Sequence, residues 1–66
     1  MNRQRIAEKL IDLRGDKTQE TVARDVGISP SALAMYEGGK RIPRDEIKLA
    51  LANYYGVSIQ ALFFEG

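Results

Sequence analysis

The chain has 66 residues, with ten basic and nine acidic side chains, a formal net charge of +1, and neither cysteine nor histidine. Disulfides and the usual zinc ligands are therefore excluded. A single domain of this length buries only about 60% of its unfolded surface, so its core carries the fold alone or with a second subunit. A charge this close to zero does not by itself indicate nucleic-acid binding, so the placement of the basic residues has to decide.

Several function classes are disfavoured by the composition. No apolar run approaches the roughly 20 residues of a membrane span, and the amphipathic start lacks the hydrophobic region of a signal peptide, so we expect a cytoplasmic protein without membrane contact. We find no paired acids placed for a cleft and no glycine-rich phosphate loop. We therefore expect no enzymatic activity, no metal or other cofactor, and no small-molecule ligand.

The whole chain, residues 1–66, is predicted to be one compact all-α domain of five helices. The first covers residues 2–13 with an apolar stripe at Ile6, Leu10 and Leu13, and the others follow at turn signals. The residues expected to start or stop the helices are Gly15, Thr18, Gly27, Ser29 with Pro30, Gly38 with Gly39, Asp45 with Glu46, Gly56 and Ser58.

The segment from residue 18 to residue 43 contains two short helices separated by a turn of only about three residues. Helices joined so tightly cross steeply and need small residues where they meet, which Ala23 and Gly27 supply. Leu33 and Tyr36 are spaced to point back into the core. The pattern predicts a helix-turn-helix over about residues 18–37.

The outward face of the third predicted helix is the candidate base-reading surface, because a helix presented by its N-terminal end fits the major groove. Its residues are Pro30, Ser31, Ala34 and Met35. Helix N-termini also offer unpaired N–H groups to phosphate, and nearby cations position a domain without reading sequence. The candidate phosphate-binding residues are Thr18, Gln19, Ser29, Lys40, Arg41 and Arg44.

The chain resembles the lambda-repressor-like helix-turn-helix family, the Cro and Xre-type regulators of phages and bacteria. The resemblance spans nearly the whole chain, including the closing YYGVSIQALF. The matching residues are Thr18, Gln19, Glu20, Val22, Ala23, Gly27, Ile28, Ser29, Ser31, Leu33, Tyr36, Glu37, Gly39, Lys40, Arg41 and Pro43.

The resemblance implies a sequence-specific regulator of transcription, of the phage or mobile-element repressor type, that binds double-stranded DNA. It implies that Gln19 contacts a phosphate and that the outer face of the third helix reaches bases. Relatives also pair the acid at Glu37 with an arginine late in the first helix, for which Arg14 is the nearest candidate. The base-facing set departs from the family because it holds one hydroxyl and no Gln, Arg or Asn, so we expect modest base discrimination.

The C-terminal aromatic residues are too numerous for a small domain to hide, and an exposed apolar patch commonly marks an interface. We therefore predict a homodimer on a roughly palindromic operator, with an interface formed by Tyr54, Tyr55, Phe63 and Phe64. Two alternatives remain open. The domain could be a protein-binding module, such as an antitoxin or adaptor, or it could be the DNA-binding part of a longer regulator.

Overall fold

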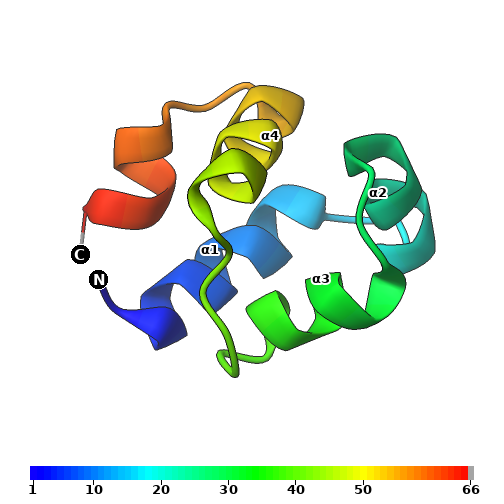
Figure 1. Cartoon of the computed structure of the whole chain (residues 1–66), viewed down its shortest axis with the longest axis horizontal. Coiled ribbons are helices and arrows are strands. Elements are labelled where there is room, and N and C mark those ends of the chain that lie inside the picture. Colours follow the sequence, from blue (N-terminus) through cyan, green and yellow to red (C-terminus); the bar gives the residue numbers. More distant parts are fainter. Residues whose placement is uncertain (66) are drawn as a thin grey trace.

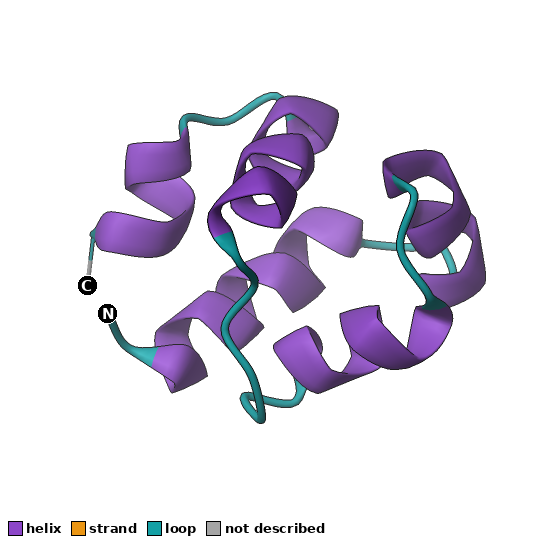
Figure 2. Ribbon diagram, viewed as in Figure 1, coloured by secondary structure: helices purple, strands orange, loops and turns teal. Residues whose placement is uncertain are grey.

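The computed structural model describes residues 1–65, which form helices joined by short loops and contain no strand (Figures 1 and 2). The elements are α1 (Arg3–Arg14), α2 (Gln19–Val26), α3 (Pro30–Glu37), α4 (Asp45–Tyr55) and η1 (Gln60–Phe64). The predicted all-α architecture of five helices is confirmed. None of the helices in this part of the chain is long and apolar enough to cross a membrane.

Side chains that cap backbone N–H groups set the starts of the first three helices. Asn2 precedes α1, and its side-chain oxygen accepts hydrogen bonds from the backbone nitrogens of Gln4 and Arg5 at 3.0 and 3.2 Å. Thr18 and Ser29 cap α2 and α3 in the same way, as predicted. Each cap satisfies donors that have no partner within the helix, so local sequence fixes where these helices begin.

The last element, η1, is a short π-helical segment where the sequence pattern predicted an ordinary short helix. The Ser58 hydroxyl still accepts from the backbone nitrogen of Ala61 at 3.0 Å, as expected of a cap. The ammonium of Lys9 donates to the carbonyl oxygens of Ala61 and Glu65 at 2.7 and 2.8 Å. Carbonyls at a helix end lack intrahelical partners, so this lysine holds the closing segment against α1.

The core lies around α1, which packs against both α3 and η1, while α2 packs against α3 and α4 (Figure 1). Its largest fully buried side chains come from all five elements: Leu10, Val22, Leu33, Leu51, Leu62 and Phe63. Every helix therefore turns one face inward. Because α2 and α3 use their inner faces for this packing, their outer faces remain on the surface.

The end of α3 meets the start of α1 at Gly39, which has a φ of +71°. The backbone nitrogen of Lys40 donates to the carbonyl of Met35 at 2.9 Å, which closes the helix with a left-handed glycine. A Cβ on Gly39 would lie 3.6 Å from Gln4 Oε1 and 4.0 Å from Ala7 Cβ. This junction places the basic loop after α3 beside the first turn of α1.

Candidate nucleic-acid interface

The corner between α2 and α3 has the geometry that the sequence predicted. Gly27 adopts a φ of +90°, and the backbone nitrogens of Gly27 and Ile28 both donate to the carbonyl of Ala23, at 2.8 and 2.9 Å. These bonds end α2 and turn the chain within three residues, and Ser29 then caps α3. The two helices are held in a fixed relation, which a helix-turn-helix requires.

The third helix has two distinct faces. Leu33 and Tyr36 are buried in the core, as predicted. The four candidate base-reading residues, Pro30, Ser31, Ala34 and Met35, are all exposed. Met35 is 39% exposed, the largest apolar side chain of the four. The outer face therefore offers one hydroxyl and an otherwise apolar surface.

The starts of α2 and α3 lie at the surface with their caps in place. The Thr18 hydroxyl oxygen accepts from the backbone nitrogen of Thr21 at 3.0 Å, and the Ser29 hydroxyl accepts from that of Ala32, also at 3.0 Å. The N–H groups of Gln19 and Glu20 at the start of α2, and that of Ser31 at the start of α3, have no partner within an α-helix, whereas Pro30 has no N–H. They add to the positive end of the helix dipole, and both ends can accept an anion.

The three basic residues of the loop after α3 are exposed, as the candidate phosphate contacts should be. Arg41 and Arg44 line an open groove of about 470 Å³, and Gly27 and Ile28 of the helix-turn-helix corner line it too. Arg44 also lies 3.9 Å from the carboxylate of Glu46, a distance typical of a weak surface ion pair. Arg41 and Arg44 thus lie next to the corner that presents α3, whereas Lys40 lies beside the start of α1.

Arg3 is exposed and joins this basic region. Its guanidinium Nη1 lies 3.4 Å from the carbonyl oxygen of Lys40, at the junction of α1 and α3 described above. The sequence separation is 37 residues, so no local pattern could have placed these two residues together. The signal that was present is the pair of glycines after α3, which lets the loop approach α1.

A polar cluster lies behind the start of α2, centred on the carboxylate of Glu37. Arg14 Nε donates to Glu37 Oε1 and Oε2 at 3.1 and 2.9 Å, so the ion pair implied by the family resemblance is present. This hydrogen bond raises the pKa of Arg14 above its ordinary value. Gln19 Nε2 also donates to Glu37 Oε1, at 2.8 Å. Gln19 is therefore half-buried and already engaged, which its sequence position alone did not indicate.

The structure corrects one residue of the predicted dimer interface, Phe63. Phe63 is only 2% exposed and belongs to the core, so it is not available to a partner. Tyr54 donates its hydroxyl proton to Asp25 at 2.8 Å and accepts from Lys17 Nζ at 3.0 Å. Tyr54 is thus engaged with α2 and with the loop that follows α1.

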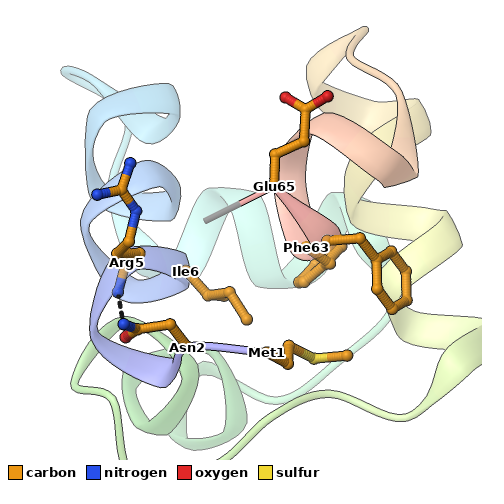
Figure 3. A pocket seen from close by; sticks show the side chains of 7 residues that line it. Met1, Asn2, Arg5, Ile6, Phe63 and Glu65 are labelled. Carbon is orange, nitrogen blue, oxygen red and sulfur yellow. Dashed lines mark hydrogen bonds between the residues drawn. The ribbon is translucent and has the colours of Figure 1, made fainter.

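Phe64 is the one residue of the predicted interface that is exposed, at 49%. It lines a cavity of about 330 Å³ between the two ends of the described chain, together with Met1 and Arg5 (Figure 3). This cavity lies at the start of α1, whereas Lys17 and Tyr54 lie beyond the C-terminal end of α1. Because a 12-residue helix is about 18 Å long, Phe64 and Tyr54 lie near opposite ends of α1.

The comparisons with known proteins identify the family. A family model described as helix-turn-helix matches residues 6–62, which is most of the chain. No significant match was found among curated proteins or among solved structures. Domains of this family bind DNA, are typically non-enzymatic, and occur in regulators of transcription. The matched span includes α2, α3 and the basic loop, and the chain therefore belongs to the lambda-repressor-like, Cro/C1-type family of helix-turn-helix domains.

Proposed function

We propose that this domain is a sequence-specific regulator of transcription, a repressor of the phage or mobile-element type, that lays α3 in the major groove. The observation that carries the proposal is the common surface of three features. The exposed face of α3, the N-termini of α2 and α3, and the cations Arg41 and Arg44 lie around one helix-turn-helix corner, and Lys40 is exposed at the other end of α3. In this proposal the cations and helix ends bind phosphates, while α3 contacts base edges.

Base discrimination in this proposal is modest. Met35 and Ala34 offer apolar contacts to thymine methyl groups, and Ser31 offers one hydroxyl that donates or accepts. No side chain on this face can form a bidentate pair with guanine or adenine. Sequence-dependent DNA shape, and a second half-site bound by a partner subunit, supply the remaining specificity.

The salt dependence of binding tests the phosphate contacts. Arg41→Ala should weaken binding to every duplex and reduce the slope of log affinity against log salt by about one unit, because one phosphate contact is lost. Fluorescence anisotropy with a labelled duplex at several salt concentrations measures both effects. Met35→Ala is the contrasting variant, since it should leave the slope unchanged and relax preference at one or two base positions. An unchanged affinity of Arg41→Ala for non-specific duplex would show that the phosphate contacts lie elsewhere.

A protein-binding role is the second candidate, favoured by the apolar outer face of α3. An exposed face with Met35 and Ala34 and a single hydroxyl also suits contact with another protein. The same titration separates the two candidates. A DNA-binding domain loses affinity steeply as salt rises, whereas an adaptor or antitoxin module of this fold would show no measurable affinity for duplex DNA.

A further inference from the structure

The ends of three helices meet on one buried carboxylate. Glu37 is the last residue of α3, and its side chain is 3% exposed. It accepts hydrogen bonds from Arg14, the last residue of α1, and from Gln19, the first residue of α2. A buried carboxylate is costly unless it is paired and hydrogen-bonded, and here both conditions are met.

Arg14 also fixes the backbone that leads into α2. Its Nη1 donates to the carbonyl oxygen of Lys17 at 2.7 Å, one residue before the Thr18 cap. One guanidinium therefore holds both the approach to α2 and the carboxylate behind it. It also neutralises Glu37, whose charge would otherwise repel a DNA phosphate at the start of α2.

The carboxylate determines how the Gln19 side chain is oriented. A carboxylate accepts hydrogen bonds only, so the amide nitrogen, and not the amide oxygen, faces Glu37. That nitrogen carries two hydrogens, and Glu37 uses one of them. Within residues 1–65 the other has no acceptor, and the side chain is half-buried at the edge of the α2 N-terminus.

We propose that Glu37 and Arg14 are positioning residues for the DNA phosphate contact of Gln19. Glu37 holds the Gln19 amide so that its second N–H is ready to donate to a phosphate beside the open N–H groups of α2, and Arg14 cancels the charge of Glu37. Neither residue touches DNA. The inference rests on the proposed function, and on the phosphate contact of Gln19 in particular.

The expected size of the effect follows from side-chain ordering. Immobilising one flexible side chain at an interface costs a free energy equivalent to about two- to tenfold in affinity, and a preordered Gln19 avoids that cost. Replacing Glu37 should therefore weaken DNA binding by about this factor. The effect should appear only in proteins that retain the Gln19 side chain.

A double-mutant cycle measures this dependence. Glu37→Ala, Gln19→Ala and the double variant are titrated with a short labelled duplex of mixed sequence. Glu37→Ala should weaken binding about two- to tenfold more in the wild-type background than in the Gln19→Ala background. Asp12→Ala is the matched control, because it removes one exposed negative charge from α1 and should have the same effect in both backgrounds. Equal effects of Glu37→Ala in the two backgrounds would overturn the proposal.

A measurement on the unmutated protein covers the case in which Glu37→Ala does not fold. The two side-chain amide protons of Gln19 are followed by NMR while the mixed-sequence duplex is added. The chemical shift of the proton that is hydrogen-bonded to Glu37 should stay unchanged. The chemical shift of the second amide proton should change when that proton donates to a phosphate. A loss of the Glu37-bonded signal on adding duplex would contradict positioning. Failure of the wild-type protein to bind duplex at all would instead contradict the proposed function.

Discussion

The hydroxyl of Tyr55 is buried without a hydrogen-bond partner among residues 1–65, and it lies near Glu37 and Arg14. Burial first, and then the negative charge of Glu37, raise the pKa of this hydroxyl to about 12. The folded state therefore binds the phenolic proton more tightly than the unfolded state, whose tyrosine keeps a pKa near 10. The resulting stabilisation is complete below about pH 10 and is lost as the pH rises through about 12.

Tyr55→Phe should make stability less sensitive to alkaline pH, because the variant has no proton to lose at this position. At neutral pH it should be at least as stable as the wild type, since it removes an unsatisfied buried hydroxyl. Urea unfolding midpoints of both proteins, measured near neutral pH and near pH 11, give the comparison. An identical alkaline loss of stability in the two proteins would assign the loss to other groups.

At the residue scale, the sequence predicted the local interactions and missed the distant ones. Thr18 and Ser29 could be recognised as caps because their partners lie three residues away. The contact between Gln19 and Glu37 spans 18 residues and that between Arg14 and Glu37 spans 23, so both depend on how three helices pack. The ion pair was accessible only through family resemblance, and the engagement of Gln19 had no sequence signal.

The turn between α2 and α3 is the element whose backbone the sequence predicted best. Gly27 has a φ of +90°, and an added Cβ would meet no heavy atom within 4 Å. The cost of replacing it is therefore backbone strain and not collision. Gly27→Ala should destabilise the domain by about 1–2 kcal/mol. Gly27→Asn should cost less, because asparagine adopts the left-handed conformation more readily.

The free energy of unfolding from urea titration of the three proteins tests this expectation. Ala and Asn variants of equal stability would show that the turn relaxes and that left-handed strain is not the cause. The DNA affinity of the folded Ala variant gives a second readout at the same scale. If Gly27→Ala displaces α3, specific binding should weaken more than non-specific binding, because phosphate contacts tolerate displacement better than base contacts.

Helix faces were predicted less reliably than helix ends. Ile11 is an apolar residue next to Leu10 of the predicted stripe, yet it is 46% exposed. Phe63 and Phe64 are adjacent and chemically identical, yet the first is buried in the core and the second is exposed. Periodicity shows that a face is apolar, but which neighbour covers it follows from the packing of the whole chain.

At the scale of the whole molecule, the size of one protomer limits how much of an operator it can contact. The Cα atoms span 27 Å along the longest axis of the domain, whereas successive major-groove segments on one side of B-DNA lie about 34 Å apart. One protomer therefore places one recognition helix in one half-site. A roughly palindromic operator requires a second copy, related by a two-fold axis, and this remains our prediction for the active form.

Phe64 is the residue through which this prediction is best tested, since it is the exposed aromatic side chain of the predicted interface. Phe64→Ser should shift the protein toward the monomer in sedimentation at high micromolar concentration. It should weaken binding to a duplex with two half-sites and leave binding to a single half-site unchanged. Ile11→Ser is the matched control, because Ile11 has similar exposure on α1 and lies outside the cavity beside Phe64. A wild-type protein that stays monomeric with and without operator would contradict the dimer, whatever the variants do.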